Sequence, residues 1–442
     1  TSLATLSIIL FFPYPVLPAI FSEGFFGLNC STSTPGFIIT TFSFARSWGA
    51  RPIVAHEWGV QVFDSSGDRE LPDLPDFLHT PKDAPKGSVT TFRPPVREMQ
   101  DDTGERDKPI LYFYLEPPQE EGVPVAVSLG FAFGKPKAWY PQADHVCAPF
   151  REVPDAATLE QWLAALGSPD FRIREEASGK LAECGPPLRT LLERALGGSK
   201  DAEIRQRLEA CLEDFLKPQL TWDHLKLVKT LPQGMELPGK TLKADHWVRQ
   251  ARQVDAAYVT NGVEGERYVF YEGKTAERPA IQVKPGSKPG GFILANVSRH
   301  PVHDVFLVCV PGFKEAFGHV ETLAPGASTE VILRDPRGPS APDRLLLRLQ
   351  ANRPERKEEG RMYRKPCEPQ GPTTESWLFE KEAEALLAIW GKDFFRGEGA
   401  RLIYREDVAA LDEAMPLALH TDMYHFIQLS RVGLVLVKGL DL

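Results

Sequence analysis

Two histidines three residues apart form the most metal-like cluster in the sequence. The run His300-Pro301-Val302-His303-Asp304 places two imidazoles beside a carboxylate. Imidazole nitrogen and carboxylate oxygen are ligands that zinc and related divalent ions accept. His319 is the candidate for a third ligand, which would give a divalent metal site of His300, His303 and His319. The simpler interpretation is a pair of solvated histidines, since the run falls where a turn between two strands is expected.

A second candidate for chemistry is His56-Glu57-Trp58-Gly59. A histidine beside a glutamate could serve acid–base chemistry or bind a metal. Neighbouring side chains on a strand point to opposite faces, however, so His56 and Glu57 are not expected to meet. The pattern therefore favours the start of a strand anchored by a buried Trp58.

A third cluster contains Arg249, Arg252 and Asp255. A buried pair between Arg252 and Asp255 that fixes a strand edge or a domain contact is the favoured interpretation. The alternative is a binding site for an anion or carboxylate. The sequence has no GxSxG, HExxH, P-loop or dinucleotide-binding pattern, so it predicts no catalytic residue and no bound organic cofactor.

Composition narrows the classes of partner. The chain has 442 residues, a net charge of −9 and 39 prolines. The negative charge argues against a nucleic-acid partner, and the prolines favour short strands and ordered loops. The cysteines are widely spaced with no CxxC pair, which disfavours a zinc knuckle. Cys184 and Cys211 fall on apolar helix faces and are expected to be buried free thiols.

The first residues resemble an export signal in hydropathy but not in charge. Residues 1–22 are apolar and carry no charged residue before Glu23, and the first basic residue is Arg46. The run Ile53-Val54-Ala55 resembles a cleavage site before His56. Residues 1–55 are therefore expected to be an export-related leader or a disordered segment, with the mature protein outside the cytoplasm, periplasmic or secreted. A membrane tether through residues 1–22 is the alternative.

Most of the chain shows the period of β-strands. Apolar side chains alternate from Val123 to Phe133, and Ile110–Leu115 is a second strand-like run. The polar turn-forming residues 117–122 between them predict a long hairpin. Residues 281–335 contain further short strands, with a turn at 323–326, and predict a β-sandwich-like antiparallel unit.

Between residues 155 and 217 the period changes to that of helices. Four apolar stripes are separated by proline and glycine, with helix starts expected at Asp155, Ser168, Pro186 and Ser199. Ile173-Arg174 recurs as Ile204-Arg205, and Leu181 recurs as Leu212 at the same offset. These helical hairpins resemble two HEAT-like repeats, with an ordinary four-helix subdomain as the alternative. Stacked repeats need about three units to bury a continuous core. We therefore expect the ends of this segment to be covered by the β-rich regions, by a partner, or by both.

The predicted fold class is α+β, mostly antiparallel and β-sandwich-like, with a HEAT-like α-solenoid fragment inserted. The predicted regions are a leader (1–55), a β-rich domain in two parts (56–153 and 219–280) around the helical insert (154–218), a sandwich-like unit (281–350), a flexible linker (351–375) and a mixed α/β region (376–442).

Several short motifs together resemble a family of exported, uncharacterised bacterial proteins. They are His56-Glu57-Trp58-Gly59, Leu111-Tyr112-Phe113-Tyr114, Trp139-Tyr140-Pro141 and Phe270-Tyr271-Glu272-Gly273. The resemblance implies export and a mature chain that begins near His56, but no activity. The sequence thus favours a non-catalytic interaction or scaffold protein that binds a protein or a cell-envelope glycan. The alternative is a metal-dependent hydrolase or glycan-processing enzyme that uses His300 and His303.

Overall fold

The computed structural model describes most of the chain beyond residue 50. The described residues are 29–31, 39–41, 51–64, 74–85, 105–115, 122–131, 135–146, 154–184, 188–214, 219–274, 278–310, 316–334, 338–351, 376–396, 399–422 and 425–440. They belong to two compact units, Thr1–Arg51 and Pro52–Leu442. In the first unit β1 (Asn29–Ser31) pairs antiparallel with β2 (Ile39–Thr41). Residues 1–22, and the predicted linker after residue 351, lie outside the described residues.

One large sheet draws its strands from nearly the whole of the second unit. Its order is β15 (Ala316–Leu323), β14 (Val302–Val310), β17 (Gly399–Glu406), β19 (His425–Leu440), β3 (Arg51–Asp64), β4 (Glu105–Leu115), β11 (Val269–Lys274) and β6 (Lys135–Tyr140). The sequence regions predicted on either side of the helical insert, and the C-terminal region, therefore meet in a single sheet.

Two further sheets are antiparallel. The first has the order β10 (Gly265–Glu266), β9 (Tyr258–Thr260), β8 (Leu220–Val228), β5 (Val123–Leu129) and β18 (Leu417–Thr421), and β7 (His145–Val146) also pairs with β8. The second consists of β12 (Ile281–Pro285), β13 (Gly291–Asn296) and β16 (Ser328–Ile332). The predicted turn after Leu323 is confirmed, because β15 ends there and Gly326 adopts a positive φ of 71°.

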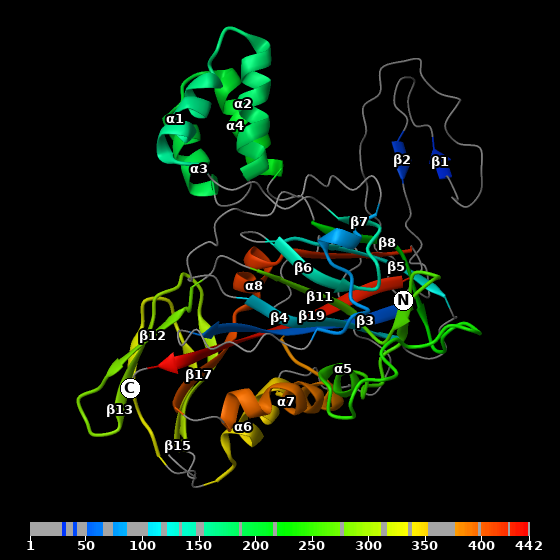
Figure 1. Cartoon of the computed structure of the whole chain (residues 1–442), viewed down its shortest axis with the longest axis vertical. Coiled ribbons are helices and arrows are strands. Elements are labelled where there is room, and N and C mark those ends of the chain that lie inside the picture. Colours follow the sequence, from blue (N-terminus) through cyan, green and yellow to red (C-terminus); the bar gives the residue numbers. More distant parts are fainter. Residues whose placement is uncertain are drawn as a thin grey trace. The chain divides into compact units, whose positions relative to one another are not determined.

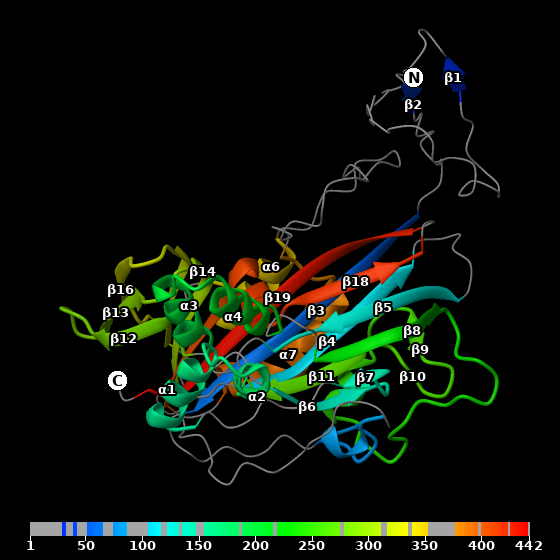
Figure 2. The ribbon, with the colours of Figure 1, turned by 90° about the horizontal axis from the view of Figure 1, so that it is seen from above.

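The large sheet is covered on both faces, which explains why its central strands are buried throughout. On one face α5 (Trp247–Ala251), α6 (Ala341–Gln350) and α7 (Glu380–Phe395) share a core with the sheet (Figure 1). On the other face, residues of the large sheet share one core with the strands around β5 and β8 and another with β12, β13 and β16. The axes of β3, β4, β5 and β8 are similarly inclined (Figure 2), with β4 antiparallel to β3 and β8 antiparallel to β5. The antiparallel-rich α+β class predicted from the sequence is confirmed.

The predicted hairpin between residues 110–115 and 123–133 is wrong. β4 pairs with β3 and β11, whereas β5 pairs with β8 and β18 in a different sheet. The alternating apolar side chains of β5 instead share one core with Leu111 and Phe113 of β4. Ile110 and Tyr112 of β4 point the other way, into the core beneath the helices. Alternation shows that a strand has one buried face, and it does not identify the strand's partner. Phe133 lies outside the described residues.

Strand β3 begins at Arg51, so the leader boundary expected at residue 55 falls inside a strand. Ile53 and Ala55 are fully buried and pair with Leu115 and Phe113 of β4. A chain that began at His56 would lack these core residues. The motif glycine of this strand also has a local role. A side chain on Gly59 would place its first carbon 3.1 Å from Pro109 Cα, at the point where the pairing of β3 with β4 shifts register.

The helical segment folds as α1 (Ala156–Ala165), α2 (Phe171–Cys184), α3 (Arg189–Gly198) and α4 (Ala202–Asp214). We call these four helices the helical module. Its buried residues form a cluster drawn only from the module, and the thiols of Cys184 and Cys211 are buried within it, as predicted. Asp155 accepts a hydrogen bond from Thr158 N at 2.8 Å and caps α1 as expected. The caps of α2 and α4 lie two residues after the predicted serines, at Asp170 and Asp201.

The remaining described elements are short. The 3-10 helix η1 spans Pro81–Asp83, and α8 spans Val408–Ala414 with Asp407 as its N-cap. Among the helices of the described residues, none combines the length and hydropathy needed to span a membrane.

Candidate functional site

His56 and Glu57 lie on opposite faces of β3, as their neighbouring positions predict. His56 faces α7, where its Nδ1 lies 2.6 Å from Glu382 Oε2. Glu57 faces away from α7 and contacts Tyr271 and Arg431. Both side chains are almost completely buried, and Trp58 is fully buried in the core beneath the helices. The motif therefore contributes to two separate polar clusters.

The His56 cluster joins the start of α7 to the large sheet. Glu382 Oε2 also accepts a hydrogen bond from Phe379 N at 2.7 Å, so this carboxylate caps the helix while it contacts His56. The imidazole stacks on the Phe379 ring, with 4.7 Å between centroids, and meets the Trp377 ring edge-on at 4.4 Å. Burial, and then the charge of Glu382, raise the pKa of Tyr114 beside it well above its ordinary value.

A histidine held by a carboxylate through Nδ1 is an arrangement that general acid–base catalysis uses, with Nε2 presented to a substrate. Here His56 and Glu382 have no exposed surface. His56 Nε2 is buried and without a hydrogen-bond partner among the described residues. A substrate atom would have to come within about 3 Å of Nε2, and aromatic rings surround the imidazole. The arrangement therefore positions α7 on the sheet.

The Glu57 cluster is a buried charge network on the other face. The fully buried Arg431 donates from Nε to Glu57 and from Nη1 to Asp412, while the Tyr271 hydroxyl donates to the second Glu57 oxygen. Burial acts to lower the pKa of Arg431, but the charge and the hydrogen bond of Glu57, together with the charges of Tyr271 and Asp412, outweigh it, so the net pKa is raised. Burial raises the pKa of Asp412. The network ties together β3, β11, β19 and α8.

His300 and His303 bind opposite ends of α8. His303 Nε2 lies 3.2 Å from Asp407 Oδ2 at the start of the helix, and His300 Nε2 lies 2.9 Å from Glu413 Oε2 at its end. A rise of about 1.5 Å per residue separates positions 407 and 413 by about 9 Å along the helix axis. Metal–ligand bonds are about 2 Å long. The two histidines thus hold a helix in place and do not converge on one ion.

His319 is separate from both. Its ring stacks on Phe306 with 4.4 Å between centroids, and burial lowers its pKa from the ordinary value of 6.5. No group of three or more His, Cys, Asp or Glu side chains within the described residues could hold a metal ion. The predicted metal site of His300, His303 and His319 is therefore wrong, because the three rings face the different partners Glu413, Asp407 and Phe306.

The predicted pair between Arg252 and Asp255 is also wrong. Arg252 Nε donates to both carboxylate oxygens of Glu266, at 3.0 and 3.1 Å, and Glu266 is fully buried. Asp255 is 75% exposed and pairs with Lys381 Nζ at 2.8 Å. Arg252 still ties the end of α5 to a strand, as expected of a structural arginine, but its partner lies in β10.

The described residues include an open groove of about 450 Å³ between α6 and α7. Its lining is partly apolar, with Leu346, Leu387 and Phe395, and Lys392 and Arg396 also line it. Neither polar cluster of β3 contributes a residue to this lining. The groove therefore lies apart from the His56 cluster and from the Glu57 cluster.

The sequence identified one side of each polar cluster and missed the other. Glu382, Arg431 and Glu266 were not singled out. The sequence could have indicated that Arg431 is buried, since it is a lone arginine directly before the apolar run Val432–Val437. No protein-family model matches the chain, and no curated protein matches it.

Proposed function

We propose that the protein is a non-catalytic interaction or scaffold protein, that its helical module is a pair of HEAT-like repeats, and that the module binds a partner protein. One observation carries the proposal. Phe171 and Ile173, at the start of α2, are 60% and 45% exposed, although the module has a core of its own. The two side chains project from different sides of the helix, because they are two residues apart. Each is a large apolar group on an otherwise polar surface, where a bound partner can bury it.

The repeat assignment is supported by contacts that recur at the same offset as the sequence pattern. Arg174 Nη1 donates to the Ser168 carbonyl at 2.8 Å, and Arg205 Nη1 approaches the Ser199 carbonyl at 3.5 Å. Asp170 caps α2 as Asp201 caps α4, in each case through the backbone N–H two residues later. The same side chains thus perform the same local tasks in both hairpins.

Export belongs to the same proposal and rests on the sequence alone, with the mature chain beginning before β3. A metal-dependent hydrolase is not favoured, because the polar groups around β3 are sealed inside the fold and the histidines near α8 hold that helix.

Photo-crosslinking tests the proposal. We would replace Phe171 in the full chain by a photoreactive phenylalanine analogue and expose the protein to an extract of the source cells. Leu347, which is also 60% exposed, is the matched control position. A discrete protein adduct is expected from position 171 and not from position 347. Equal adducts from both positions, or an adduct from neither, would contradict a binding face on the module.

A further inference from the structure

The exposed face of α2 has a counterpart inside the module. Ile204 is the equivalent of Ile173 in the second repeat, and it lies against the loop between α1 and α2. A first side-chain carbon on Gly167 would stand 3.2 Å from Ile204 Cδ1, so the absence of a side chain on Gly167 admits this isoleucine. Ile204 is partly buried against the module core, whereas Ile173 is exposed. Ile173 thus has the position of a packing residue without the preceding repeat on which to pack.

The opposite end of the module has an open glycine on which such an isoleucine could pack. Gly198 is the equivalent of Gly167 in the second repeat, and a side-chain carbon added there meets nothing within 4 Å. An isoleucine packs against Gly167 from within the module, and no described residue packs against Gly198 in the same way. The module therefore exposes at one end the isoleucine, and at the other end the glycine, of a contact that it already makes internally.

We propose that the module binds a second copy of this chain head to tail, with Ile173 of one copy packed on Gly198 of the other. The inference rests on the proposed function and names the partner that binds Ile173. A contact between two different surfaces does not close on itself as a two-fold contact does. Self-association is therefore expected to grow beyond dimers as concentration rises.

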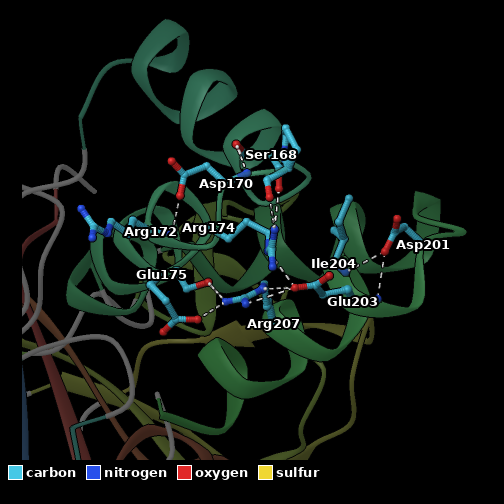
Figure 3. A network of polar contacts seen from close by, with 11 residues as sticks. Ser168, Asp170, Arg172, Arg174, Glu175, Asp201, Glu203, Ile204 and Arg207 are labelled. Carbon is cyan, nitrogen blue, oxygen red and sulfur yellow. Dashed lines mark hydrogen bonds and ion pairs between the residues drawn. The ribbon is translucent and has the colours of Figure 1, made fainter.

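Charges at this junction make the contact weak. Within the module Arg174 Nε lies 2.7 Å from Glu203 Oε1, and Arg207 Nη1 lies 2.6 Å from Glu175 Oε1 (Figure 3). In the proposed contact the first repeat of one copy follows the second repeat of the other. Arg172 of the first copy then stands where Glu203 stands within the module, and Arg205 of the other copy stands where Arg174 stands. Arg172 is exposed and points away from the internal network (Figure 3). Two arginines then face each other across the junction, so Arg172→Glu should restore the internal pattern and tighten the contact about fivefold.

Sedimentation velocity of the full chain over a range of concentrations tests the inference. The wild type is expected to show a mass that rises with concentration. Ile173→Ala removes the packing side chain, and Gly198→Leu fills its site from the other end. Each variant alone should associate at least about tenfold more weakly. Leu347→Ala, at a position that is 60% exposed, should behave like the wild type, and circular dichroism melts verify that every variant folds.

The decisive arm mixes the two variants. Gly198→Leu keeps its isoleucine and Ile173→Ala keeps its open glycine, so an equimolar mixture should form a one-to-one dimer and grow no further. A wild type that stays monomeric at every concentration would overturn the inference. A mixture that does not associate, or an Arg172→Glu variant that associates no more tightly, would overturn the head-to-tail geometry. An adduct from position 171 with a different protein would leave the proposed function standing.

Discussion

Replacing Arg431 by methionine tests whether the Glu57 network holds the large sheet together. The substitution leaves Glu57, which is 1% exposed, with the Tyr271 hydroxyl as its remaining described partner. Removing one partner from a buried ion pair costs about 3–5 kcal/mol, because the other charge stays buried without compensation. We expect Arg431→Met to lower the free energy of unfolding by about this amount. Urea titration followed by tryptophan fluorescence measures it.

Two further variants make the test specific. Glu57→Gln/Arg431→Met removes both charges while Tyr271 can still donate to the amide oxygen, so the double variant should be more stable than Arg431→Met alone. Arg299→Met removes an arginine that is 74% exposed in its pair with Glu413, and it should change stability little. A structural role for the Glu57 network is contradicted if Arg431→Met lowers the free energy of unfolding no more than Arg299→Met does, or if the double variant is no more stable than Arg431→Met.

Three other predictions use the same measurement of unfolding. Burial lowers the pKa of His319, so the unfolded chain binds a proton at this imidazole before the folded chain does, and stability is lost as pH falls below about 6.5. His319→Phe should therefore lose less stability than the wild type between about pH 7 and pH 5. Parallel profiles of stability against pH for the two proteins would contradict this. Gly59→Ala should lower stability by about 1–3 kcal/mol through overpacking. Gly179→Ala, at an exposed helical position with nothing within 4 Å, should raise stability by about 0.5–1 kcal/mol. Equal effects would show that the close approach of Pro109 is not the reason for a glycine at position 59. Deleting residues 1–50 should leave the free energy of unfolding of the second unit unchanged. Deleting residues 1–55 should lower it by about 3–6 kcal/mol, because buried residues of β3 are lost. Equally stable truncations would show that the start of β3 contributes little to stability.

Local patterns in the sequence located elements well and partners poorly. The helix stripes, the strands after residue 281 and the cap at Asp155 follow from spacing and residue type, which act over short stretches of chain. The hairpin prediction failed because two neighbouring strands that bury apolar side chains in one core can face each other across that core and never pair. Sheet order here depends on contacts such as that of β3 with β19, which join the two ends of the described second unit.

The candidate site shows the same division. The sequence correctly placed His56 and Glu57 on opposite faces, because that follows from the geometry of a strand. It could not supply Glu382 or Arg431, which come from the far end of the chain. His300, His303 and His319 were predicted to form a metal site because their proximity in sequence suggested that they bind one ion. The structure places the partners of the first two histidines at opposite ends of α8, and it places the ring of Phe306 beside the third.

The central claim is that the polar residues around β3 and α8 maintain the fold and do not carry out a reaction. Metal content of the purified full chain, measured by mass spectrometry after growth with zinc, manganese and iron, tests it most directly. We expect well below one equivalent of any transition metal, with no change in His300→Ala/His303→Ala. A stoichiometric ion that is lost in this double variant would contradict the account and restore the metal-dependent hydrolase.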